Sequence, residues 1–191
     1  MIYNKEYFET GNYKNYNERS LKYKKLAKEL SELLQKLSLI RNDSIILDYG
    51  CATGHLLEGF KDLEYTNISG IDISEYAITQ CYNRGLIAKL PHTDMFADIL
   101  IALDVFEHMT DKEVYKVLTI PMNMAIIRVP VAIKLGEDFH LDISKKDSTH
   151  INCKTAEQWK DLFYDHFSCV LDLNLTLIYS SPGVASLLLI K

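Results

Sequence analysis

The chain has 191 residues, of which 48% are hydrophobic, and a formal net charge of −5. Such a length can bury one hydrophobic core, roughly 70% of the unfolded surface, and the acidic balance argues against a surface built for nucleic acid phosphates. Because no Cys-x-x-Cys pair, signal segment or membrane-spanning apolar run is present, we expect a single cytoplasmic domain over residues 1–191 with no membrane partner.

The first nineteen residues are rich in aromatic side chains that follow no regular period, among them Tyr7, Tyr13 and Tyr16. Such a segment either closes over a ligand or anchors a terminus by ordinary aromatic packing, and both interpretations stay open. Leucines then recur at helical spacing and predict a helix over residues 20–39.

The stretch from residue 45 to residue 57 is the most informative part of the sequence. An apolar run ends at Asp48, passes through a turn that contains Gly50 and Gly54, and resumes with helical periodicity at about His55. In an open parallel sheet, this is how a strand leads to a helix whose first amides face an anionic or polar ligand. Glycine suits such a turn because it adopts backbone conformations that other residues avoid.

Short apolar strands alternate with amphipathic helices along the rest of the chain, which predicts a parallel sheet covered on both faces. The second strand, over residues 67–72, ends at Asp72, and Ser74 is placed to cap a helix that extends to residue 84. The remaining predicted elements are strands at 86–90, 97–103 and 125–130, helices opened by capping boxes at Thr110 and Thr155, and antiparallel strands at 170–179 and 184–190.

Four features, taken in this order, resemble the class I S-adenosylmethionine-dependent methyltransferases, in particular the small-molecule O-methyltransferase branch. They are Asp48-x-Gly50-x-x-x-Gly54 after a strand, Asp72 at the end of the next, Asp104-Val105-Phe106-Glu107-His108 after the fourth, and the terminal strand pair. The resemblance implies a doubly wound, Rossmann-like α/β fold of seven strands, with the last strand antiparallel and helices on both faces. It implies a catalytic core over residues 44–191 and an aromatic lid over residues 1–19.

The resemblance also implies how S-adenosylmethionine is bound. Asp48 suits the methionine ammonium group, Asp72 accepts hydrogen bonds from two ribose hydroxyls, and Ile73 offers apolar surface to the adenine. Ala52 stands where the family often has glycine, and we expect its small methyl group to be tolerated. The other expected cofactor-binding residues are Gly50, Cys51, Gly54 and Asp104.

A second group of polar residues provides the catalytic candidates. Asp104, Glu107 and His108 are spaced to gather on one side of a turn, and His150 precedes another helix. This pattern resembles the one by which small-RNA 2′-O-methyltransferases hold a divalent ion, and its mixed ligands suit manganese, iron or zinc better than magnesium. We favour the alternative, that Glu107 and His108 pin the loop to the following helix. His140 either lines the substrate pocket or lies on a solvated edge, and we favour the edge.

The function predicted from the sequence is methyl transfer from S-adenosylmethionine to a small molecule, with a hydroxyl as the first guess for the acceptor. The alternative is a non-catalytic module that binds S-adenosylmethionine or S-adenosylhomocysteine, or a subunit of a larger assembly. An oxidoreductase is a distant third, because a dinucleotide fingerprint requires glycine at Ala52 and a small residue at His55. No oligomeric state is predicted.

Overall fold

The computed structural model describes residues 3–10, 16–175 and 182–191. Contacts divide the chain into two compact units, Met1–Asp94 and Met95–Lys191. The strands of the described residues have the order β3-β2-β1-β4-β5-β7-β6, and only β7 is antiparallel to its neighbours. This strand order and the reversed last strand confirm the predicted fold class. The single-domain organisation stays a prediction.

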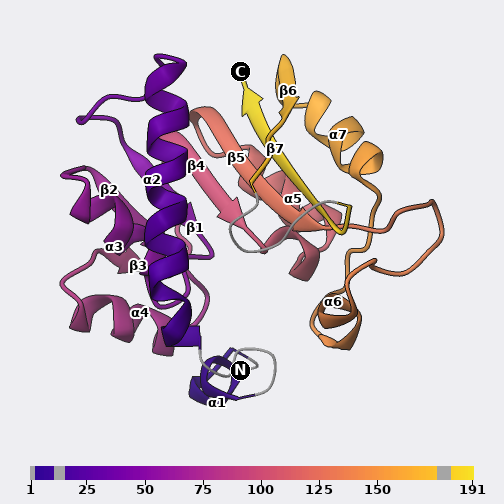
Figure 1. Ribbon diagram of the computed structural model, residues 1–191, viewed down its shortest axis with the longest axis horizontal. Helices are drawn as coiled ribbons and strands as arrows, with labels where there is room; N and C mark the ends of the chain where they lie inside the picture. The colour runs from indigo at the N-terminus through magenta and orange to yellow at the C-terminus, as the bar shows by residue number, and fades with distance from the viewer. Residues whose placement is uncertain (1–2, 11–15, 176–181) are drawn as a thin grey trace. The chain divides into compact units, whose positions relative to one another are not determined.

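The first unit contains the first three strands of the chain and the helices that precede and connect them. Its elements are α1 (Lys5–Glu9), η2 (Tyr16–Arg19), α2 (Ser20–Lys36), β1 (Ile46–Tyr49), α3 (His55–Asp62), β2 (Ile68–Ile71), α4 (Glu75–Asn83) and β3 (Ala88–Lys89) (Figure 1). β1 and β2 are parallel, with Tyr49 opposite Ile71. Since parallel strands end at the same edge, Asp48 and Asp72 lie at neighbouring strand ends.

The helix α2 ends three residues earlier than its leucine periodicity predicts. Ser38 takes the left-handed conformation at φ 58°, and the Leu39 amide donates to the Leu34 carbonyl at 2.8 Å. This long bond across the helix end is the Schellman arrangement, which satisfies terminal carbonyls and stops the helix.

The predicted Ser74 cap at the start of α4 is confirmed, because the Ala77 amide donates to the Ser74 hydroxyl at 3.1 Å.

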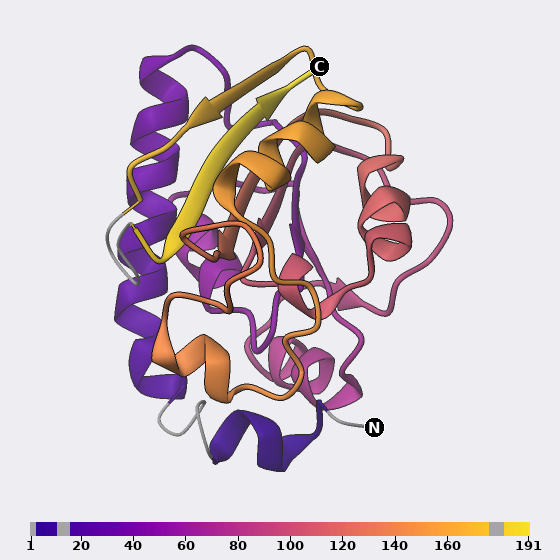
Figure 2. The same cartoon turned by 90° about the vertical axis from the view of Figure 1, so that its right-hand side faces the viewer.

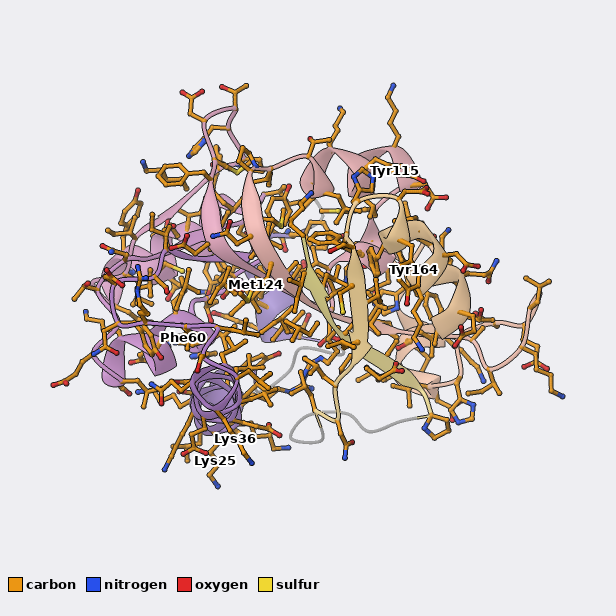
Figure 3. The ribbon with its side chains drawn as sticks, turned by 90° about the horizontal axis from the view of Figure 1, so that it is seen from above. Lys25, Lys36, Phe60, Tyr115, Met124 and Tyr164 are labelled. Atoms are coloured by element: carbon orange, nitrogen blue, oxygen red, sulfur yellow. The ribbon has the colours of Figure 1, made fainter. Side chains whose placement is uncertain are left out.

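The helices α2 and α3 pack closely because α3 carries a glycine at their contact. A Cβ on Gly59 would lie 2.7 Å from the Ala27 Cβ and 2.9 Å from the Lys24 Cα. Figure 3 looks along α2 and shows Lys25 and Lys36 projecting from its outer side, where both residues are exposed. Lys25 and Lys36 therefore lie on a solvated face of α2. Lys24 instead forms an ion pair with Asp62, with its Nζ 2.8 Å from Oδ2.

Gly59→Val is expected to destabilise the protein by about 2–3 kcal/mol, because the added methyls collide with backbone atoms of α2. A change from glycine normally strengthens a helix, so a loss here indicates the close contact rather than helix propensity. The measurement is the free energy of unfolding in urea. The exposed Lys61→Ala on the same helix is the control and should change it by less than about 0.5 kcal/mol. A neutral Gly59→Val would contradict the packing described.

The second unit carries the remaining strands. Its elements are β4 (Ala97–Leu103), η3 (Phe106–His108), α5 (Asp111–Leu118), β5 (Met122–Pro130), α6 (Asp142–Lys146), α7 (Ala156–Tyr164), β6 (Cys169–Asp172) and β7 (Val184–Ile190). Figure 2 shows α7 against the β6–β7 pair, where Trp159 is fully buried. Both capping boxes are confirmed, at Thr110 and at Thr155.

The second unit differs from the sequence predictions in two strand boundaries and in one additional helix. β5 starts at Met122 because this residue already pairs with Ala97 of β4. α6 was not predicted, since it is a five-residue helix without a side-chain cap. β6 ends at Asp172, and residues 176–181 of the predicted strand and turn lie outside the described residues. Among the helices of the described residues, none combines the length and apolar character needed to cross a bilayer.

Candidate functional site

The turn between β1 and α3 takes a conformation that requires small residues. Gly50, Ala52 and Gly54 all have left-handed backbones, with φ values of 79°, 48° and 85°. A Cβ on Gly54 would lie 2.7 Å from Leu86 Cδ1, so only glycine fits there. The amides of Gly50 and Cys51 both donate to the Ile71 carbonyl, at 2.7 and 3.0 Å, which fixes the turn at the end of β2.

Asp72 ties this turn to the start of α4. Its Oδ2 accepts from the Ala52 amide and its Oδ1 from the Ser74 amide, both at 2.8 Å. The left-handed Ala52 is therefore held by a charge-assisted hydrogen bond, a contact that the sequence did not indicate. Each carboxylate oxygen keeps a second lone pair for a ligand hydroxyl. The next residue, Ile73, is 49% exposed and offers unpartnered apolar surface beside the carboxylate.

Asp48 is a buried carboxyl group whose electrostatics favour a cationic ligand. Burial and, to a smaller extent, the nearby negative charge of Asp72 together raise its pKa to about 8. Burial also raises the pKa of Asp72, although the amides of Ser74 and Ala52 oppose this. Two carboxyls that resist ionisation together are stabilised as carboxylates when an ammonium group approaches them.

His55 begins α3 as a buried neutral side chain. Burial and the adjacent Arg84 lower its pKa to about 4. Its Nδ1 lies 2.6 Å from Arg84 Nη1 and therefore accepts, which leaves Nε2 to donate to the Thr53 hydroxyl at 3.3 Å. This network links the glycine turn to the end of α4 and was missed in the sequence, because Arg84 lies 29 residues away along the chain.

The aromatic N-terminal segment is attached to α4 within the first unit. Phe8 is buried and stacks on Tyr76 with ring centroids 5.9 Å apart, and the Tyr76 hydroxyl donates to Glu9 at 2.9 Å. These contacts were not predicted. The residues proposed for the lid are placed as follows: Tyr7 is half-buried in α1, Tyr16 begins η2, and Tyr13 lies outside the described residues.

In the second unit, Asp104 is engaged by an arginine. Asp104 follows β4 with a left-handed backbone, and its Oδ1 accepts from the Nε of Arg128 at 3.0 Å. A second bond from Nη2 to Oδ2, at 2.5 Å, completes a fork. The Arg128 side chain is 1% exposed, so the pair is largely desolvated. Each oxygen of Asp104 therefore accepts one bond from Arg128, and Asp104 is not among the residues whose ligand atoms lie together in the cluster described next.

Glu107, His108 and His150 form a compact cluster of metal-ligating groups. One ligand atom from each lies within 4.8 Å of the others. Glu107 Oε1 is 3.9 Å from the Nε2 of each histidine, and the two imidazole centroids are 4.6 Å apart. Phe139 packs against His150 with centroids 5.2 Å apart and gives the cluster an apolar wall.

The main chain of Glu107, rather than its side chain, pins the loop to the segment after His150. Its carbonyl accepts from the amides of Ile151 and Asn152, at 2.8 and 3.0 Å. The carboxylate Oε2 is buried and has no hydrogen-bond partner among the described residues. Burial and Asp104 raise the pKa of Glu107, while burial and His150 lower the pKa of His108 to about 4. Neutral imidazoles and an unpartnered carboxyl oxygen fit a divalent cation.

His140 lies apart from this cluster on an exposed position. Its amide donates to the Val131 carbonyl at 2.9 Å, which holds the segment after β5. This exposure fits the solvated edge favoured from the sequence. Among the described residues, the group of possible metal ligands does not include His140.

A family model described as a methyltransferase domain matches residues 21–166. The chain belongs to this methyltransferase family. It is an enzyme of the class I fold, and its cofactor is S-adenosylmethionine. This confirms the family, enzyme class and cofactor predicted from the glycine turn and the two strand-end aspartates.

Solved structures share the fold of this methyltransferase at low sequence identity. A SAM-dependent methyltransferase from Archaeoglobus fulgidus is 17% identical with a TM-score of 0.63, covering 86% of this chain and 94% of that one. The magnesium protoporphyrin IX methyltransferase from Synechocystis is 15% identical, TM-score 0.60, covering 90% and 84%. The [4+2]-cyclase SpnF is 15% identical, TM-score 0.63, covering 85% and 80%. No curated protein sequence matches the chain at a significant level.

Proposed function

We propose that this methyltransferase transfers a methyl group from S-adenosylmethionine to a hydroxyl group of a small molecule in the cytoplasm. Asp48 and Asp72, at neighbouring strand ends beside the glycine turn, bind the ammonium group and the ribose. The turn residues Gly50, Cys51, Ala52 and Gly54 let the cofactor approach the backbone, and Ile73 contacts the adenine. The observation that carries this assignment is the pair of buried carboxyls at the ends of two parallel neighbouring strands, beside the left-handed turn.

The cluster in the second unit supports the choice of a hydroxyl group as the acceptor. A hydroxyl must lose its proton to accept a methyl group, so a group that stabilises the alkoxide or phenolate assists the reaction. Glu107, His108 and His150 would hold a divalent cation, which supplies this stabilisation when bound. The buried, unpartnered Oε2 of Glu107 supports this role over a purely structural one, because the main chain already makes the structural contacts.

A small-molecule acceptor is supported by the chemistry named for similar folds. Among the neighbours are a magnesium protoporphyrin IX methyltransferase and a plantazolicin methyltransferase, which is 17% identical with a TM-score of 0.63. The net charge of −5 also disfavours a polyanionic nucleic acid acceptor. The cyclase with this fold supports an alternative, in which the cofactor is retained and no methyl group is transferred.

The test is incubation with methyl-labelled S-adenosylmethionine and an extract of hydroxyl-bearing metabolites, with Mn²⁺ or with a chelator. We expect labelled product that forms with Mn²⁺ and falls at least about 100-fold with chelator or in Glu107→Gln, since removing a metal ligand or its metal removes the charge stabilisation. Glu157→Gln, at an exposed position on α7, is the matched control and should keep full activity.

Two outcomes would contradict parts of this proposal. Tight S-adenosylhomocysteine binding with no labelled product would favour the non-catalytic module. If labelled product forms equally well with chelator and in Glu107→Gln, methyl transfer is supported but the role of a divalent cation is contradicted.

A further inference from the structure

A chain of hydrogen bonds connects Asp147 to His108 through Thr149. The Asp147 Oδ1 accepts from the Thr149 amide at 2.9 Å and from the Thr149 hydroxyl at 2.5 Å. The same hydroxyl oxygen lies 2.9 Å from Nδ1 of His108, and the Thr149 carbonyl lies 3.3 Å from that nitrogen. The side chains of His108 and Asp147 are 12% and 8% exposed and Thr149 is half-buried, so these bonds are partly shielded from water.

The direction of each bond follows from counting hydrogens. A threonine hydroxyl has a single hydrogen, and an ionised carboxylate can only accept, so this hydrogen points to Asp147. The hydroxyl oxygen must then accept from His108, which requires a hydrogen on Nδ1. The Thr149 carbonyl leads to the same conclusion, because a carbonyl oxygen also only accepts.

We infer that Asp147 and Thr149 are positioning residues that fix His108 as the Nδ1–H tautomer, so that its Nε2 lone pair faces Glu107. This inference rests on the proposed function, in which that nitrogen is a cation ligand. A histidine ligand usually donates its other ring N–H to a neighbouring acceptor, and this second contact sets both the tautomer and the ring orientation. Glu107 Oε1, 3.9 Å from His108 Nε2, marks the side to which the lone pair is presented.

Asp147 and Asp104 differ in their hydrogen bonds. Each oxygen of Asp104 accepts one bond from Arg128. The oxygen of Asp147 that Thr149 does not use lies 3.8 Å from His150 Nε2, so its negative charge also faces the cluster. Asp147 is therefore the aspartate that hydrogen bonds connect to His108 through Thr149, although it is not adjacent to the Glu-His pair in sequence.

The tautomer can be read directly by nitrogen NMR of the metal-free protein. Long-range ¹H–¹⁵N correlation should show the Nδ1–H form for His108, with the signals assigned by their loss in His108→Gln. Thr149→Val removes the hydroxyl acceptor and Asp147→Asn weakens its orientation, so both should populate the Nε2–H form. Thr149→Ser keeps the hydroxyl and should retain the wild-type pattern. Thr119→Val, an exposed threonine on the same unit, is the matched control.

Binding of Mn²⁺ alone, measured by electron paramagnetic resonance, provides the second readout. Thr149→Val should weaken Mn²⁺ about tenfold and Thr149→Ser by less than about threefold, in the range expected for an outer-shell contact. The inference is overturned if wild-type His108 is the Nε2–H form, or if Thr149→Ser behaves like Thr149→Val in the NMR spectra. If wild-type His108 is the Nδ1–H form but the protein binds no Mn²⁺, the role of Asp147 and Thr149 in fixing the tautomer is supported. In that case the divalent cation of the proposed function is contradicted.

Discussion

Asp72→Ala is expected to weaken the binding of S-adenosylhomocysteine about 100-fold or more. The substitution removes the proposed acceptor of two ribose hydroxyls, and hydrogen bonds to a charged group contribute about 1.5–3 kcal/mol each. It also removes the Ala52 and Ser74 amide contacts, which hold the glycine turn in its left-handed conformation. The measurement is isothermal titration calorimetry of the metal-free protein with S-adenosylhomocysteine.

The control is Asp94→Ala, which removes the same charge at an exposed position of the same unit and should leave the affinity unchanged. Thermal melting of both variants separates loss of the turn from loss of the fold. An Asp72→Ala variant that melts like the wild type and binds the ligand equally well would contradict the role of Asp72.

Affinity for S-adenosylhomocysteine should rise by about 75-fold between pH 5.5 and pH 7.5, since a pKa of about 8 leaves Asp48 mostly protonated across that range. The ligand's ammonium group binds the carboxylate form, so binding must release a proton from Asp48. Each pH unit below the pKa therefore increases the competent fraction about tenfold. Calorimetry in buffers of different ionisation enthalpy should show close to one proton released per ligand at pH 7.

Asp48→Asn provides the matched control for this pH dependence, because it keeps the size of the side chain and removes its titration. The variant should bind more weakly at pH 7.5 and show little change with pH. His55 does not complicate the measurement, since its pKa of about 4 leaves it neutral throughout the range. An Asp48→Asn variant with the wild-type pH profile would show that another group carries the proton.

The features that the sequence predicted well are those that depend on neighbours along the chain. The strand ending at Asp48, the glycine turn and the Ser74 cap each involve residues within a few positions of one another. The parallel pairing of β1 and β2 then brings Asp72 to the neighbouring strand end, because parallel strands share their carboxyl edge. Local pattern, one topological rule and the resemblance to a known family together indicated these residues as candidates for cofactor binding.

The features that the sequence did not predict arise from contacts between distant positions. Arg128 lies 24 residues from Asp104, and nothing in β5 indicates that its side chain binds that carboxylate. Thr149 lies 41 residues from His108, so the hydrogen bond between them, and its direction, can be recognised only in the folded structure. The sequence grouped Asp104 with the Glu-His pair by spacing, and this grouping stays a prediction, to which the structure adds the two bonds from Arg128.

We propose that Asp48 and Asp72 bind the two ends of an adenosyl amino acid beside the glycine turn. The decisive measurement is a crystal structure of the complex with S-adenosylhomocysteine. We expect both ribose hydroxyls within hydrogen-bond distance of the Asp72 carboxylate and the ammonium group beside Asp48. A ligand bound elsewhere, or one with its ribose away from Asp72, would contradict it.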